Sequence, residues 1–184
     1  MRRGLAFIAC ILLAHMTAPV AAAQVGDGPP VHAGAKVRTD TPSGYPVPRF
    51  VSLKSAKTYC RLGPTFRHPV RYTYLRKGLP VLVVAETTDH WRKIRDSEGA
   101  ECWAHKSKLS GERTVLVVEE GLALRVAPET GAAARARLAA GVIARLMAET
   151  DGWRRIEADG VRGWAPAPGL WGAERFSTQE ASRD

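Results

Sequence analysis

Short apolar runs separated by turn residues fill the chain between residues 49 and 172. Phe50–Leu53 alternates apolar and polar positions, and Thr58–Leu62 ends at a Gly-Pro pair. Leu79–Ala85 is a continuous apolar run with an early proline. Runs of four to eight residues bounded by glycine, proline or aspartate are typical of β-strands.

Two longer segments predict β-hairpins. Residues 91–105, WRKIRDSEGAECWAH, alternate on both sides of a turn at Asp96 to Gly99. Residues 153–166, WRRIEADGVRGWAP, have the same arrangement around Asp159-Gly160, a dipeptide typical of tight hairpin turns.

The whole pattern occurs twice. Arginine, proline, glycine and tryptophan positions recur at an offset that shrinks from 64 to 61 residues, and only at turns. The pairs include Arg61/Arg125, Pro64/Pro128, Gly78/Gly141, Trp91/Trp153 and Trp103/Trp164. A repeat that keeps tryptophans and turn residues in register indicates two copies of one folding unit.

Each copy, about 49–111 and 112–172, is expected to form a small barrel of five or so short strands. The fold class is therefore all-β, with two tandem barrels packed side by side because almost no linker joins them. Residues 131–140, GAAARARLAA, contain helix-favouring alanines. We expect a long loop there with about one helical turn, since the matching residues 65–77 contain Pro69 and two tyrosines.

The first 23 residues have the features of an export signal. Arg2 and Arg3 precede a largely apolar stretch, and Ala21 to Ala23 form a small-residue cleavage site. The stretch is short for a membrane span. Residues 1–23 are thus predicted to be a signal peptide, with retention as an anchor the alternative, and the protein to be periplasmic or secreted. Residues 24–48 predict a flexible Pro/Gly-rich leader and 173–184 a polar tail.

Removal of the signal takes Cys10 with it and leaves Cys60 and Cys102. Exported chains tend to pair their cysteines because their compartment is oxidising. The counterparts in the second copy are Leu124 and Gly163, so one copy has both cysteines and the other has neither. This pattern predicts a Cys60–Cys102 disulfide, with two separately buried thiols as the alternative.

The formal net charge is +9, and +7 once Arg2 and Arg3 are removed. A positive protein attracts anionic cell-wall polymers, phospholipid headgroups or nucleic acid. Export argues against nucleic acid. The basic residues are dispersed in short clusters, so a solvated surface explains them as well as a binding patch does.

No residue constellation points to catalysis or metal binding. Cys60 could be combined with His68, His90 or His105, but its counterpart Leu124 favours a structural role for the cysteine. The histidines are far apart, and no CxxC or HxxxH spacing occurs. The acidic residues near the first hairpin are explained by its turn. We expect no enzyme activity, no metal and no cofactor.

The order of motifs resembles a known family. The strands YCRLGP and LRVAP, the strands VLVVAE and ARLMAE, and the W-x-x-I and G-W-x motifs around a turn resemble tandem bacterial SH3-like (SH3b) domains. The chain looks especially like the small exported alphaproteobacterial type that begins R-F-V-S-L-K-S, here residues 49–55. The resemblance implies SH3-like domains at 49–111 and 112–172. Two departures are Ala127 at a turn glycine position, and Cys60 and Cys102 at usual valine and glycine positions.

Aromatic and basic side chains concentrate in the first unit. Tyr72 and Tyr74 are two residues apart and share one face if the chain is extended there. The second unit has alanines at the matching places. Such side chains on a rigid barrel suit a peptide or glycan chain. The candidate ligand-binding residues are Tyr59, Tyr72, Tyr74, Arg71, Trp91 and Trp103. The alternative for the tryptophans is core packing, which would explain why both units have them.

The sequence thus predicts an exported, non-enzymatic protein that binds cell-wall peptidoglycan, or an extended peptide, through its first domain. The alternative is a scaffold or regulator that docks on another envelope protein, such as a cell-wall hydrolase or a sensor. Neither nucleic acid nor a stable membrane span after signal cleavage is expected, and the sequence does not indicate an oligomeric state.

Overall fold

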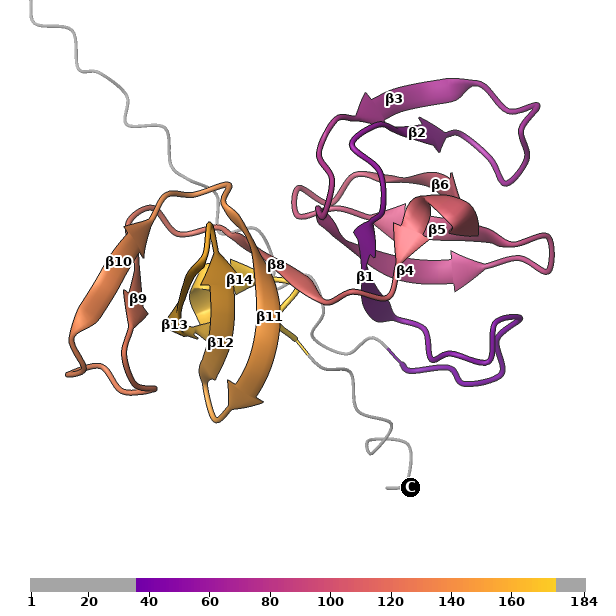
Figure 1. The fold of residues 1–184 in the computed structure, drawn as a ribbon. Coiled ribbons are helices and arrows are strands. Elements are labelled where there is room, and N and C mark those ends of the chain that lie inside the picture. The colour runs from indigo at the N-terminus through magenta and orange to yellow at the C-terminus, as the bar shows by residue number, and fades with distance from the viewer. Residues whose placement is uncertain (1–35, 175–184) are drawn as a thin grey trace, which may run out of the picture. The chain divides into compact units, whose positions relative to one another are not determined.

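The computed structural model describes residues 36–174, which contain two seven-stranded antiparallel sheets (Figure 1). The first sheet has the strand order β3-β2-β6-β5-β4-β1-β7. Its elements are β1 (Arg49–Leu53), β2 (Thr58–Arg61), β3 (Val70–Tyr74), β4 (Pro80–Glu86), β5 (Trp91–Arg95), β6 (Glu101–His105), the 3₁₀ turn η1 (Lys106–Lys108) and β7 (Leu109–Ser110).

The second sheet repeats this topology, with the order β10-β9-β13-β12-β11-β8-β14. Its elements are β8 (Thr114–Val117), β9 (Leu122–Arg125), β10 (Ala134–Leu138), β11 (Ile143–Thr150), β12 (Trp153–Ala158), β13 (Val161–Pro166), the 3₁₀ turn η2 (Ala167–Gly169) and β14 (Leu170–Trp171). The predicted all-β class with two tandem domains is confirmed; the side-by-side packing stays a prediction.

Both predicted hairpins are present. In the first, the Asp96 amide donates to the Ala100 carbonyl at 3.1 Å, and Gly99 takes a φ of +86°. In the second, Asp159 and Gly160 have φ values of +47° and +79°. Two consecutive positive φ values match the twist of a tight antiparallel hairpin, which explains the Asp-Gly pair.

The described residues form two apolar cores, built from inward-facing strand positions; the first also includes Leu116 of β8 and Trp171 of β14. The isoleucines of the two W-x-x-I motifs, Ile94 and Ile156, are completely buried in their respective cores. Cys60 and Cys102 are buried in the first core and form the predicted disulfide, with their Cα atoms 5.5 Å apart. The disulfide joins β2 to β6, whose strands are 42 residues apart in sequence.

The prediction of a loop at residues 131–140 is wrong, because Ala134–Leu138 is strand β10. It pairs with β9 from Ala134↔Arg125 to Leu138↔Leu122, with a bulge between Ala134 and Ala136. Backbone pairing with a neighbouring strand outweighs the weak helix preference of alanine.

Residues 36–48, the described part of the predicted flexible leader, instead form a compact turn on the first domain. Arg38 and Val47 form a β-bridge, and the Val47 side chain is only 2% exposed. The Ser43 amide donates to the Glu86 carboxylate at 3.1 Å. The predicted signal peptide lies outside the described residues, as does the tail from residue 175 onward; Ala173 is buried in the second core.

Candidate functional site

Two tyrosines of β3 form the centre of the candidate site. Tyr72 pairs with Cys60 and Tyr74 with Thr58 across the ladder, so both rings lie on the inner face of the strand at the margin of the core. Their ring centroids are 5.2 Å apart at an interplanar angle of 87°, the edge-to-face arrangement that aromatic pairs favour. The i, i+2 spacing therefore places them on one face, as predicted.

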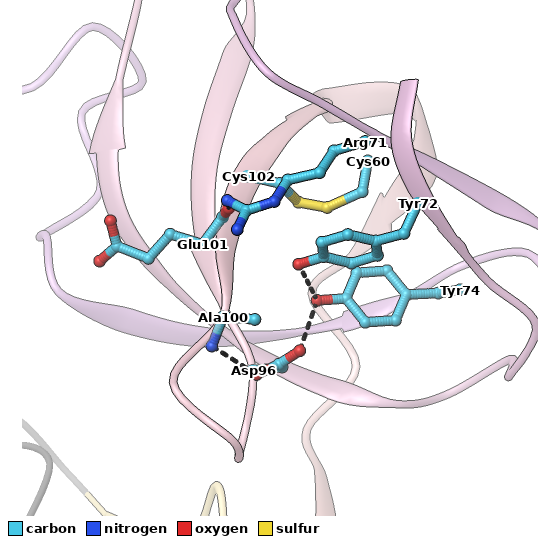
Figure 2. Close-up of a disulfide and its surroundings, with 8 residues drawn as sticks. All are labelled: Cys60, Arg71, Tyr72, Tyr74, Asp96, Ala100, Glu101 and Cys102. Carbon is cyan, nitrogen blue, oxygen red and sulfur yellow. Dashed lines mark hydrogen bonds between the residues drawn. A yellow bond between two sulfur atoms is a disulfide. The ribbon is translucent and has the colours of Figure 1, made fainter. Parts of the chain in front are cut away.

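Asp96 completes a chain of hydrogen bonds with this pair. Tyr74 Oη donates to Asp96 Oδ2 at 2.9 Å, and the hydroxyls of Tyr72 and Tyr74 are 3.2 Å apart (Figure 2). The carboxylate is fixed by the hairpin turn, since its Oδ1 accepts from the amides of Glu98 and Ala100 at 3.1 and 2.9 Å. The turn thus holds a charged acceptor beside the tyrosines.

The direction of the chain follows from the protonation of Tyr74. Burial, and then its hydrogen bonds with Tyr72 and Asp96, raise the pKa of Tyr74 far above its ordinary value, so the phenol stays protonated. Because Tyr74 gives its single proton to Asp96, its oxygen accepts from Tyr72. The Tyr72 oxygen keeps acceptor capacity for a ligand.

A groove of about 430 Å³ lies along this chain. Its walls include Tyr72, Tyr74 and Asp96, together with Arg76 and Leu79, and Leu116 of β8 also lines it. Strand β3 stands at the end of the first sheet's order, so within the described residues its outer edge has no strand neighbour. The groove therefore combines aromatic faces with polar acceptors, and it lies beside the last strand of the sheet.

The second domain lacks this polar chain. In the ladder of β9 and β10, Ala136 pairs with Leu124 and Leu138 with Leu122, which makes them the counterparts of Tyr72 and Tyr74. Alanine is expected from the sequence at both counterparts; this prediction is correct for Ala136 and wrong for the counterpart of Tyr74, which is Leu138. Asp96 corresponds to Ala158, which is buried in the second core together with Leu138. The same fold forms with three apolar residues in these places.

The other predicted site residues do not all lie beside the tyrosine pair: some lie on the opposite face of the first sheet. Arg71 stays near the pair: its Nη1 donates to the Glu101 carbonyl at 3.2 Å, and Figure 2 shows it alongside the disulfide. Tyr59 is 45% exposed on the opposite face of β2 from buried Cys60. Trp103 likewise faces away from its buried neighbour Cys102.

Trp91 is only 4% exposed, because the Phe66 ring covers it at 4.9 Å in an edge-to-face contact. This agrees with the alternative of a packing role for that tryptophan. Sequence reasoning missed Asp96, which was interpreted as a turn residue alone. Alignment of the two repeats could have indicated Asp96, since the first copy has an acid where the second has Ala158.

The three histidines of the first domain make local contacts. His68 Nδ1 lies 2.8 Å from Thr65 Oγ1 and His105 Nδ1 lies 2.9 Å from Ser107 Oγ, while His90 occupies a turn with a φ of +68°. Between residues 36 and 174, no group of three or more His, Cys, Asp or Glu side chains could hold a metal ion. In the same part of the chain, no helix has the length and apolarity needed to cross a bilayer.

Comparison with known proteins decides the family. The sequence matches the bacterial SH3 domain family twice, over residues 54–111 and 118–172. The chain belongs to the bacterial SH3 domain family. No curated protein matches the chain.

Similar solved structures are NlpC2 and NlpC1 from Trichomonas vaginalis and an NlpC/P60 family protein from Bacillus cereus. The two Trichomonas proteins are 16% and 15% identical, each with a TM-score of 0.31, and the alignments cover 69% and 77% of this chain. The Bacillus protein is 14% identical with a TM-score of 0.30 and 66% of this chain covered. The chain spans about half the length of these proteins, 49%, 51% and 55% respectively.

Proposed function

We propose that this bacterial SH3 protein is exported and binds cell-wall peptidoglycan, or an extended peptide, through the tyrosine groove of its first domain. The observation that carries the proposal is the Tyr72–Tyr74–Asp96 chain, whose counterparts in the second domain are apolar. Since the second domain forms the same topology without it, the fold does not require the chain. A half-buried polar chain that folding does not need is a candidate for binding.

The groove has chemistry suited to such ligands. Tyrosine rings offer flat apolar faces for a sugar ring or a peptide plane, and their hydroxyls offer hydrogen bonds. The free edge of β3 offers backbone donors and acceptors to an extended chain, which is how many domains bind peptides. The net charge of +7 after signal removal favours approach to an anionic wall polymer.

A non-enzymatic role is part of the proposal. The two cysteines of the first domain are joined in a disulfide, so neither offers a thiolate nucleophile. Tyr74 is held protonated, and Asp96 Oδ1 is engaged by two backbone amides. These groups are arranged to hold a ligand in place.

A second candidate is docking on another envelope protein. Exposed apolar side chains, Leu62, Phe66 and Leu75, flank β3 on both sides in sequence and favour it. Cross-linking in cells separates the candidates: one protein partner at fixed stoichiometry supports docking, whereas recovery of wall fragments supports the glycan.

The test of the groove uses the second domain's own residues. The variant Tyr72→Ala/Tyr74→Leu/Asp96→Ala places in the first domain the side chains that already pack in the second, so we expect it to fold. Loss of two aromatic contacts is worth about 1–3 kcal/mol, which predicts at least about fivefold weaker retention on purified peptidoglycan.

The matched control is Tyr59→Ala, which removes an exposed tyrosine from the opposite face and should be retained as the wild type is. Retention is measured in a pull-down at graded salt, and folding by circular dichroism. Equal retention of the triple variant and the wild type would remove the groove from the proposal.

A further inference from the structure

A second cavity of the first domain is lined with cations. It has a volume of about 520 Å³ and lies between the turn of residues 43–49, strand β1 and the η1–β7 segment. Arg49, Arg92 and Lys106 line it, and Phe50 and Leu109 add apolar surface. It shares no lining residue with the tyrosine groove.

Positive charge is in excess at this cavity. Glu86 Oε1 lies 2.5 Å from Arg49 Nη2 and 2.9 Å from Arg92 Nε, so one carboxylate faces two guanidinium groups. Lys106 adds a third positive charge. The neighbouring His105 is affected: burial, and then the charges of His90, Lys106 and Arg92, lower its pKa. An anionic group bound here would offset this excess.

The second domain has a counterpart of this site that already holds a peptide segment. Arg113 precedes β8 as Arg49 opens β1, and Arg154 follows Trp153 as Arg92 follows Trp91. Arg154 Nε donates to the Ala173 carbonyl at 2.9 Å. Arg113 Nη2 donates to the carbonyls of Gly172 and Glu174 at 3.1 and 3.4 Å. Three successive carbonyls of the turn that follows β14, in which Gly172 has a φ of +89°, thus lie on the two arginines.

The segment also brings a carboxylate. Glu174 ends the segment, and Arg113 donates to its carbonyl. Burial raises the pKa of the Glu174 carboxyl, while backbone hydrogen bonds and then the charges of Arg154 and Arg113 act in the opposite direction. In the first domain, Arg92 donates to the Trp91 carbonyl as Arg154 does to the Trp153 carbonyl. Arg49 donates to the Pro46 carbonyl, and both Arg49 and Arg92 pair with Glu86.

We propose that the cation-lined cavity of the first domain binds an acidic peptide, with its carboxylate against Lys106 and the two arginines. In the second domain, the corresponding arginines Arg113 and Arg154 bind the three consecutive carbonyls of Gly172–Glu174, a segment that ends in a glutamate. The site is separate from the tyrosine groove and does not depend on what that groove binds.

The probe is a fluorescein-labelled peptide, Leu-Trp-Gly-Ala-Glu, the sequence of residues 170–174. Its binding to the full mature chain is measured by fluorescence anisotropy at graded salt. We expect saturable binding that weakens as salt rises, and about fivefold weaker binding of the peptide with glutamine in place of glutamate.

The variant Lys106→Glu reverses the charge of an exposed cavity residue and should weaken binding of the acidic peptide about fivefold. Its matched control, Lys108→Glu, makes the same change on η1 outside the cavity lining. Because the counterpart of Lys106 is Ala167, a loss in this variant reports on the first domain.

The Tyr72→Ala/Tyr74→Leu/Asp96→Ala variant should bind the probe as the wild type does, which separates this site from the groove. Equal binding of the glutamate and glutamine peptides would overturn the proposal, as would equal losses in Lys106→Glu and Lys108→Glu or no binding to the wild type.

Discussion

The duplicated positions of the two cores hold different but compensating side chains. Cys60 and Cys102 correspond to Leu124 and Gly163. A Cβ atom added at Gly163 would lie 2.7 Å from Leu124 Cγ and 2.7 Å from the Arg125 carbonyl oxygen. The leucine therefore occupies the volume that a second side chain would need. One domain fills this place with a disulfide and the other with a Leu/Gly pair.

We predict that Cys60→Leu alone is less stable than Cys60→Leu/Cys102→Gly. The single variant crowds a leucine against the remaining cysteine, and overpacking of this kind costs about 1–3 kcal/mol. The double variant reproduces the Leu124/Gly163 pair and relieves the crowding. Urea unfolding of both variants measures the difference. A single variant as stable as the double would mean that the two cores differ in backbone at this place.

A second compensating pair, Gly63 and His68, explains why the second domain has Ala127 at a turn position that is usually glycine. A Cβ at Gly63 would lie 2.3 Å from the His68 ring, whereas the second copy has Ala127 and Ala132 at these positions. Alanine is tolerated there because the histidine is absent. In both domains the repeated arginine donates to the carbonyl of this residue at 2.7 Å, Arg61 to His68 and Arg125 to Ala132. The recurring arginine thus supports a loop.

Residue spacing predicted part of the candidate site. Alternation within one strand was enough to place Tyr72 and Tyr74 on a common face. It could not reveal Asp96, because the Tyr74–Asp96 bond joins β3 to the turn between β5 and β6, 22 residues later in the chain. Nor could it show that the loop residue Phe66 covers Trp91. Contacts made across a barrel depend on the closed fold and leave no local pattern.

At the scale of elements, the turn of residues 36–48 is likewise fixed by contacts with residues far away in the sequence, which a local pattern does not show. The Gly/Pro-rich composition of residues 24–48 predicted flexibility, but Glu86 accepts a hydrogen bond from Ser43, 43 residues earlier in the chain. Burial alone raises the pKa of Glu86; hydrogen bonds from Ser43 and Arg49 and the charges of both arginines outweigh it, so the pKa lies below its ordinary value. The carboxylate, 1% exposed, holds the turn to the domain.

This arrangement makes the first domain sensitive to acid. A carboxyl group with a lowered folded pKa stabilises the fold above its ordinary pKa of about 4.3, and the contribution disappears as pH falls through the folded value. We predict that Glu86→Gln lowers the unfolding free energy by about 2 kcal/mol at pH 7, with a smaller difference as pH approaches 3.

The measurement is urea unfolding between pH 3 and 7, followed by hydrogen exchange of peptides from residues 49–111. Glu98→Gln, on the exposed hairpin turn, is the matched control and should behave as the wild type at every pH. A deficit in Glu86→Gln that stays constant with pH would rule out the proposed role of the ionised carboxylate.

At the scale of the whole molecule, the duplication made the fold predictable. Tryptophans, turn glycines and strand ends in register twice over describe one topology, and both sheets have the same strand order. The exception was β10, whose alanine-rich sequence has no strand signature of its own and forms a strand through its pairing with β9. The two domains also serve as controls for each other, since any feature present in one alone is dispensable for the topology.

The disulfide is such a feature, and it predicts a difference between the domains. A crosslink that closes a loop of this length stabilises a fold by up to about 4 kcal/mol, mainly by restricting the unfolded chain. Reduction should therefore lower the stability of residues 49–111 and leave residues 114–171 nearly unchanged.

Hydrogen exchange with mass spectrometry, before and after treatment with a reducing agent, separates the two responses by peptide. The double variant Cys60→Leu/Cys102→Gly is the control, because it has no disulfide and its exchange should not respond to the reducing agent. Equal loss of protection in both domains after reduction would contradict the prediction, since the crosslink joins only β2 and β6 of the first domain. A local response would show that the bridge contributes stability to that domain alone, whereas the second domain depends on its packed Leu124/Gly163 pair.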